Sequence, residues 1–230
     1  MTTENNNSQK IHLLLYAKGE HYLNCANKLK DKCLKNKIVD NVAICTHDQL
    51  QSTDFYINNK ELIDSHKAGY WVWKPFLIKE YLKTLNEGDY LIYHDGGNEA
   101  YKYYKNSFNM DNLKPFLEKV SKEYNGMLPG IWQNTLHKEY CKQDCFHFME
   151  CNEDRYRNSQ QISASWSVWQ KGAQNIDNFL NEWLHYCLDR KCVSDDSSIC
   201  CKTENQEFKT HRHDQAILTN LTLMISSPIK

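Results

Sequence analysis

The amino-acid sequence predicts an α/β fold with a mixed, mostly parallel central sheet flanked by helices. The first observation behind this prediction is a compact apolar run at residues 11–16, followed by helical spacing of apolar residues over 20–37 and a second apolar run at 42–45. A β-α-β order of this kind implies parallel strands. The second is that strand-like and helical segments continue to alternate further along the chain. The third is the length of 230 residues, which suits one large α/β domain.

The later elements follow from the same periodicities. Residues 71–85 have helical spacing, and Pro75 is acceptable there because it falls in the first turn. Gly88 ends that helix, and the apolar run at 90–93 predicts the next strand. The remaining expectations are a helix at 112–124, a short strand at 130–133, a strand at 162–169, a helix at 176–188, a long polar loop at 189–210 and a last helix at 213–223.

Composition limits the classes of function. The formal net charge of −1 favours neither nucleic acid nor any other polyanion, so an anionic ligand must be held by local groups. Residues 1–9 are polar and rich in Asn, which predicts a disordered tail, and residues 10–230 are expected to form a single domain. Without a secretory signal or an apolar run long enough to span a bilayer, we expect a cytoplasmic protein whose ten cysteines are mostly reduced.

One carboxylate is expected at a functional position. Asp95 follows the strand predicted at 90–93 and precedes Gly96 and Gly97, which let a large ligand approach the backbone. Ligands of open α/β sheets bind at the carboxyl ends of the strands, and a carboxylate there suits a hard divalent cation that also holds phosphates. The alternative is a turn Asp that binds its own backbone.

Three motifs resemble those of a family of small GT-A-type glycosyltransferases found in large DNA viruses and bacteria. They are GYWVWKP at 69–75, GDYLIYHDG at 88–96 and HRHDQAIL at 211–218, and the resemblance covers most of the chain. The chain departs from the family where Gly96-Gly97-Asn98 replaces Ala-Gly-Cys and where Lys67-Ala68 replaces Arg-Gly. The Asp-x-Asp signature of many such enzymes is reduced here to one Asp.

The resemblance implies a Rossmann-like nucleotide-sugar domain of the GT-A type. It implies transfer of a sugar, most simply from a UDP-sugar, to a hydroxyl group of a glycan or glycoprotein, with Mn²⁺ or Mg²⁺ bridging the protein and the donor diphosphate. If the protein is viral, the host cytoplasm is its expected location. The donor base, the sugar, the acceptor, the stereochemical outcome and the oligomeric state stay open.

Roles follow for named residues. Asp214 is the candidate catalytic base, with the N-cap of the last helix as the alternative role. His211 and His213 are candidate metal ligands beside Asp95, with solvated loop histidines as the alternative. The residues expected to bind the donor are Tyr16, Lys18, Tyr70, Trp73, Lys74, Asp95, Gly96 and Gly97, although Trp73 is also a candidate for the core. Those expected on the acceptor side are Gln133, Asp144 and Gln161.

Two other classes of function remain. Cys141, Cys145, His147 and Cys151 lie within eleven residues, and three Cys with one His form a known zinc set, so a zinc-clipped binding or scaffold module is one alternative. Buried free thiols are the simpler explanation of the same cysteines. The second alternative is a nucleotidyltransferase, which also uses a metal held by carboxylates but releases pyrophosphate.

Overall fold

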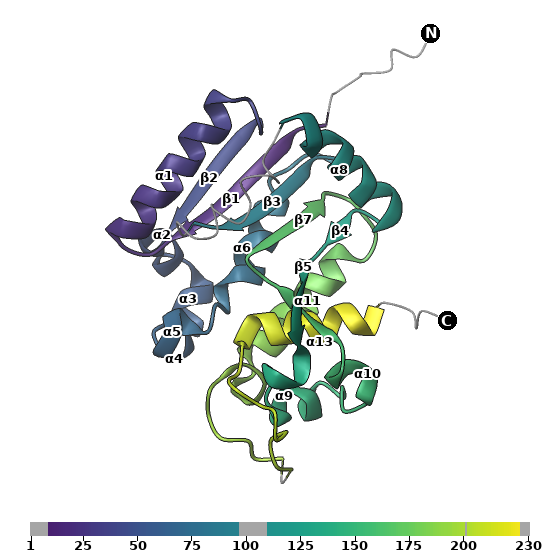
Figure 1. The fold of residues 1–230 in the computed structure, drawn as a ribbon. Coiled ribbons are helices and arrows are strands. Elements are labelled where there is room, and N and C mark those ends of the chain that lie inside the picture. The colour runs from purple at the N-terminus through teal and green to yellow at the C-terminus, as the bar shows by residue number, and fades with distance from the viewer. Residues whose placement is uncertain (1–8, 97–109, 201, 226–230) are drawn as a thin grey trace. The chain divides into compact units, whose positions relative to one another are not determined.

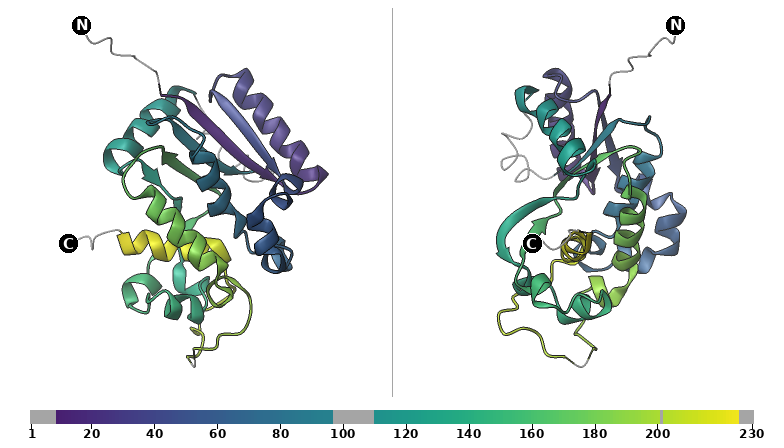
Figure 2. Two further views of the ribbon diagram at one scale, coloured as in Figure 1. Left: turned by 180° about the vertical axis from the view of Figure 1, so that it is seen from behind. Right: turned by 90° about the vertical axis from the view of Figure 1, so that its right-hand side faces the viewer.

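The computed structural model describes residues 9–96, 110–200 and 202–225. The fold is α/β, with a mixed, mostly parallel central sheet flanked by helices, and is compatible with a Rossmann-like fold (Figure 1). The chain divides into two compact units: unit 1 comprises residues 1–47, 81–128 and 168–174, and unit 2 comprises residues 48–80, 129–167 and 175–230. Each unit is therefore built from three separate segments of the chain, which the colours of Figure 2 identify by residue number. The single domain at 10–230 stays a prediction.

The central sheet confirms the predicted parallel arrangement at its first three strands. Strand β1 (Ile11–Ala17) lies between β2 (Asn41–Thr46) and β3 (Tyr90–Asp95) and is parallel to both. The full order is β2-β1-β3-β7-β4, in which β4 (Met127–Leu128) runs antiparallel to β7 (Trp166–Gln170). This sheet places the carboxyl ends of β1, β2 and β3 at one edge.

Unit 1 buries β1 along its whole length, and Leu13 and Leu15 are completely inaccessible to solvent. Such a continuous apolar strand is typical of a parallel sheet that is covered on both faces. Helix α1 (Glu20–Lys35) connects β1 to β2 and buries Cys25, Ala26, Leu29 and Cys33. Helix α8 (Met110–Glu123) packs beside β4.

Two carboxylates fix the beginning of β1. The backbone N–H of Lys10 donates to Asp89 Oδ1 at 2.8 Å, and that of Ile11 donates to Asp40 Oδ2 at 2.7 Å. Asp89 is 5 % exposed and also accepts the N–H of Asn86 at 3.3 Å. These bonds satisfy backbone donors at the amino-terminal end of β1, opposite to the carboxyl ends of the parallel strands.

Unit 2 is mostly helical around the two-stranded antiparallel sheet of β5 (Ile131–Leu136) and β6 (Gln160–Ser163). Helix α11 (Ile176–Leu188) packs against α13 (His213–Ile225), and Trp183 lies in the core without solvent exposure. The shorter elements are α2 (His47–Gln51), α3 (Asp54–Asn58), α4 (Lys60–Ile63), α5 (His66–Gly69), α6 (Trp73–Leu82), η1 (His137–Glu139), α9 (Gln143–Phe148), α10 (Asp154–Arg157) and α12 (Arg190–Val193); α2 and α6 extend into unit 1.

Three sequence-based element predictions need correction. The single strand predicted at 162–169 is wrong, because β6 and β7 are separate strands that belong to different sheets. The helix predicted at 71–85 begins two residues later, because Tyr70 and Trp71 have left-handed backbone conformations. The loop predicted at 189–210 contains a turn of helix, α12. Pro75 lies in the first turn of α6, as predicted.

None of the helices in the described ranges is long and apolar enough to cross a membrane. The nine cysteines in those ranges are free thiols. Cytoplasmic localisation stays a prediction. Residues 1–8, which make up most of the predicted tail, and Gly97 lie outside the described residues.

The anchoring of β1 yields a stability prediction. Replacing Asp89 by Ala removes the charged acceptor of two part-buried backbone hydrogen bonds, so we expect the free energy of unfolding to fall by about 1–3 kcal/mol in urea denaturation. Asp31→Ala, at an exposed position of α1, is the matched control and should change it by less than about 0.5 kcal/mol. Equal effects of the two substitutions would refute the anchoring role of Asp89.

Candidate functional site

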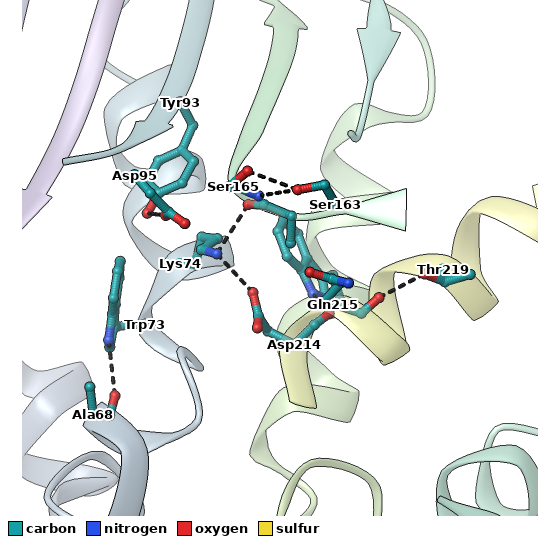
Figure 3. A network of polar contacts seen from close by, with 12 residues as sticks. Ala68, Trp73, Lys74, Tyr93, Asp95, Ser163, Ser165, Asp214, Gln215 and Thr219 are labelled. Carbon is teal, nitrogen blue, oxygen red and sulfur yellow. Dashed lines mark hydrogen bonds and ion pairs between the residues drawn. The ribbon is translucent and has the colours of Figure 1, made fainter. Parts of the chain in front are cut away.

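Asp95 is the last residue of β3 and lies at the carboxyl edge of the parallel sheet, half-buried. Its register partner on β1 is Tyr16. The hydroxyl of Tyr93, two residues earlier on the same face of β3, donates to Asp95 Oδ1 at 2.7 Å (Figure 3). Because Tyr93 is completely buried, this bond holds the carboxylate in a defined orientation.

The backbone around Asp95 is held as well. His94 donates its Nδ1–H to the carbonyl oxygen of Asp95 at 2.6 Å. Burial lowers the pKa of His94 more than the nearby Asp95 raises it, so the ring is neutral at pH 7. At Gly96 a Cβ atom would lie 3.1 Å from the carbonyl oxygen of Tyr16, so this glycine lets the ends of β1 and β3 approach each other.

The ends of the neighbouring strands add further polar groups to this edge of unit 1. The Tyr16 hydroxyl bonds to Nδ1 of His47 at 2.8 Å, and His47 directly follows β2. Lys18 is exposed, and Gly19, at φ 82°, turns the chain from β1 into α1. The sequence therefore correctly placed Tyr16, Lys18, Asp95 and Gly96 at one edge of the sheet, and it missed His47 and Tyr93.

Unit 2 contains a turn of unusual backbone conformation just before Lys74. Four successive residues, Ala68 to Trp71, have φ angles of 52°, 65°, 53° and 59°. L-amino acids adopt this left-handed conformation as single residues, at a cost of about 1–2 kcal/mol each for residues other than Gly. Gly69 is required for a second reason, because a Cβ there would lie 2.5 Å from backbone atoms of Ile63.

A second left-handed residue packs against that turn. His213, at φ 45°, begins α13, and its ring lies 4.8 Å from the ring of Tyr70 and 5.9 Å from that of Trp71. Strained backbone of this kind persists only where the surrounding packing enforces it, and it is frequent at functional sites. Tyr70, predicted to face a donor, is 4 % exposed and belongs to this packing.

The residues that follow the two left-handed segments form a buried ion pair. Lys74 Nζ lies 3.0 Å from Asp214 Oδ2 and 3.0 Å from the carbonyl oxygen of Ala164 (Figure 3). Lys74 and Asp214 are 3 % and 4 % exposed, so the two buried charges partly compensate each other. The carbonyl oxygen of Asp214 also accepts the indole N–H of Trp183.

This geometry revises two of the predicted donor contacts. Lys74 was expected to present a cation to phosphate, but its charge is compensated by Asp214. Trp73 was expected to present a flat surface, but it is 3 % exposed and donates its indole N–H to the carbonyl oxygen of Ala68 at 3.2 Å. The alternative role of Trp73 in the core fits the structure.

The other polar residues of the HRHDQ motif, residues 211–215, bind partners within unit 2. Arg212 donates to Gln133 Oε1 at 3.1 Å and lies over the ring of Tyr140. Gln215 donates to Oε1 of Gln133 and Oε1 of Gln161. Gln133 and Gln161, predicted to contact an acceptor, thus support the beginning of α13.

His211 does not fit the predicted role of metal ligand. Its Nδ1 accepts the N–H of Lys142 at 3.2 Å, and its Nε2 donates to the carbonyl oxygen of Cys192 at 2.8 Å. Burial, with the nearby His213 and Lys142, lowers the pKa of His211 well below its usual value, so the ring is neutral with both nitrogens engaged. For His213 the Nδ1–H donates to the carbonyl oxygen of Val193, and its role as a metal ligand stays a prediction.

Asp144 also has a structural role in place of the predicted contact with an acceptor. It is 1 % exposed, and its carboxylate accepts the backbone N–H groups of Ile199 and Cys200 at 2.9–3.0 Å. Burial acts to raise the pKa of this carboxyl, but the hydrogen bonds outweigh it and the pKa is lowered. Asp144 therefore fastens the loop that leads from α12 to α13.

The cysteines of the zinc alternative are structural thiols. Cys141, Cys145 and Cys151 are at most 2 % exposed, and burial raises the pKa of each, so they are protonated at pH 7. The Asn220 amide lies 4.0 Å from the Cys141 sulfur and 3.7 Å from the Cys145 sulfur. Among the described residues no group of three or more His, Cys, Asp or Glu side chains is arranged to hold a metal ion, so the zinc clip is not supported.

Comparisons with known proteins do not extend this picture. No protein-family model matches the chain, and neither curated proteins nor solved structures gave a significant match.

The left-handed turn yields a pair of opposite predictions. Gly69→Ala should lower the free energy of unfolding by about 2–4 kcal/mol, because it adds both backbone strain and a clash with Ile63. Ala68→Gly, one residue earlier, should stabilise the protein by about 0.5 kcal/mol, because Gly adopts this φ without strain but loses more entropy on folding. Urea denaturation of both variants measures this contrast, and a tolerated Gly69→Ala would contradict the turn's geometry.

The lowered pKa of Asp144 predicts a dependence of stability on pH. Because the folded-state pKa lies below the ordinary value of 3.8, the contribution of Asp144 is fully present above that value and is lost as the pH falls through it toward the folded-state pKa. We therefore expect the difference in unfolding free energy between wild type and Asp144→Asn to be constant near neutral pH and to shrink below about pH 4. A difference that grows toward acid would overturn the assignment.

Proposed function

We propose that the protein is a GT-A-type glycosyltransferase that uses a nucleotide-sugar donor and a divalent metal ion. The observation that carries the proposal is Asp95, a half-buried carboxylate at the carboxyl end of β3 and oriented by Tyr93. Ligands of parallel α/β sheets bind at this edge. The motifs at residues 69–75, 88–96 and 211–218, which resemble those of the glycosyltransferase family, support the same reading.

The residues present fit a metal ion that is only partly held by protein. Asp95 supplies one oxygen-bearing ligand, and Mg²⁺ or Mn²⁺ bound to nucleotides typically takes one or two carboxylates together with water and phosphate oxygens. Such an ion, when bound, stabilises the negative charge that develops on the departing diphosphate. In this proposal Asp95 holds the ion, and Tyr16 and Lys18, at the end of β1, bind the nucleoside part of the donor.

Asp214 is the proposed base for the acceptor hydroxyl. Pairing with the Lys74 ammonium requires the carboxylate form of Asp214, and that is the form that a base needs. Lys74 therefore acts as a positioning residue in place of the phosphate contact expected from the sequence. The hydrogen bonds of Gln215 and the stacked His213 keep the first turn of α13 in place, which holds Asp214.

The donor site is tested by thermal unfolding with nucleoside diphosphates and nucleotide sugars, each with and without Mn²⁺. A ligand at about 100 times its dissociation constant adds about 2.7 kcal/mol. For a chain of this size we expect a rise of several degrees in the unfolding temperature that requires both nucleotide and metal. The rise should vanish in Asp95→Asn.

Two further variants sharpen that test. Tyr93→Phe keeps the carboxylate but removes the bond that orients it, so the metal-dependent shift should shrink without vanishing. Asp31→Asn, on the exposed face of α1, should leave it unchanged. An undiminished shift in Asp95→Asn would rule out the metal site, and no shift with any nucleotide would favour a non-catalytic binding or scaffold module.

A further inference from the structure

Residues 28–37, which comprise the second half of α1 and the two residues after it, carry a concentration of positive charge that the proposed activity does not use. Five lysines fall within ten residues, and Asp31 is the one acidic residue among them. The whole chain has a formal net charge of −1, so this charge is local. The lysines are Lys28, Lys30, Lys32, Lys35 and Lys37.

These lysines border the solvent side of the helix. Helix α1 lies beside β1 and β2 (Figure 1), and its buried residues are Cys25, Ala26, Leu29 and Cys33. Lys28, Lys35 and Lys37 are exposed. Leu34, an apolar side chain among them, is 39 % exposed. Exposed lysines beside an exposed apolar side chain are features that this segment shares with helices that rest on a membrane surface.

Ordinary helix electrostatics explains only part of this pattern. Lys32 and Lys35 lie in the last turn, where cations interact favourably with the helix dipole. Helix α8 of the same unit offers a comparison, because there Lys119 pairs with Glu123 at 3.5 Å and Lys122 pairs with Glu118 at 3.8 Å. Lys119 and Lys122 of α8 are thus balanced by acidic neighbours, whereas residues 28–37 have a formal charge of +4 from five Lys and one Asp.

We propose that the basic surface formed by α1 and the residue pair that follows it, defined by Lys28, Lys35, Lys37 and Leu34, docks on an anionic membrane surface. The lysines would lie near anionic headgroups and Leu34 would enter the boundary with the acyl chains. All five cations of this segment are Lys, which acts as a point charge, and none is Arg, which gives the planar two-pronged contacts of nucleic-acid recognition. Charge complementarity together with exposed Leu34 favours a membrane over nucleic acid.

The test is co-sedimentation of the full chain with vesicles of phosphatidylcholine alone and of phosphatidylcholine mixed with phosphatidylserine. We expect binding to the mixed vesicles only, weakened at high ionic strength. Replacing Lys28, Lys35 and Lys37 together by Glu should lower the bound-to-free ratio by about tenfold or more. Leu34→Ala should weaken binding at an ionic strength where electrostatic attraction is already screened.

The matched control changes the same amount of charge on α8 by replacing Lys114, Lys119 and Lys122 with Glu. Vesicle binding should persist in that variant, because α1 is intact. An equal loss of vesicle binding in both triple variants would show that binding depends only on net charge, and it would overturn the proposed docking surface. The absence of binding to mixed vesicles would also overturn it. A third contradicting result is binding of single-stranded RNA that depends on these lysines, together with no binding of vesicles. Circular dichroism of each variant confirms that loss of binding is not loss of fold.

Discussion

Two opposite charges that are almost completely buried stabilise a protein only when they face each other, and Lys74 and Asp214 impose this condition on unit 2. Asp214 directly follows left-handed His213, and Lys74 lies shortly after the left-handed turn at residues 68–71. Rings of this turn pack against the ring of His213. Removing either charge would take an oppositely charged neighbour away from the other buried charge, a change that typically costs about 3–5 kcal/mol. The backbone strain at residues 68–71 and at His213 is therefore offset by contacts that also set the position of Asp214.

The HRHDQ motif shows how one short segment can support a site through several partners. His211 and His213 each donate to a carbonyl oxygen at the end of α12, and Gln215 bonds to residues of β5 and β6. Asp144 fastens the intervening loop. Most of the motif's polar side chains thus hold the beginning of α13, which leaves Asp214 as the member with a proposed chemical role.

Local patterns were sufficient for the first half of the fold. The apolar runs at β1, β2 and β3 and the helical spacing of α1 are properties of contiguous residues, so parallel strands with Asp95 at their carboxyl edge were predictable. The separation of β6 from β7 was not, because the pattern over residues 162–169 continues through Ala164 and Ser165 without a strong turn signal. The left-handed turn was also hidden, since Tyr70 and Trp71 are residues that normally avoid this conformation.

The predicted site residues differ in the same way, according to whether local sequence determines their position. Asp95, Gly96 and Tyr16 depend on strand ends and were placed correctly, whereas the partners of Lys74, His211 and Asp144 depend on segments 50 or more residues away, or on backbone carbonyl groups, and carry no sequence signal. The lysines of the docking surface that we propose lie close together in the sequence, but the exposure of Leu34 among them is known only from the structure.

We propose that the chain cleaves a nucleotide sugar between the sugar and the diphosphate. Phosphorus NMR of the protein incubated with a panel of nucleotide sugars and Mg²⁺ tests it directly, because transfer to an acceptor or slow transfer to water releases a nucleoside diphosphate. The proposed function predicts nucleoside diphosphate as the product in wild type and its loss in Asp95→Asn. Release of pyrophosphate in the presence of nucleoside triphosphate and sugar phosphate, with nucleotide sugars left intact, would contradict it and favour a nucleotidyltransferase.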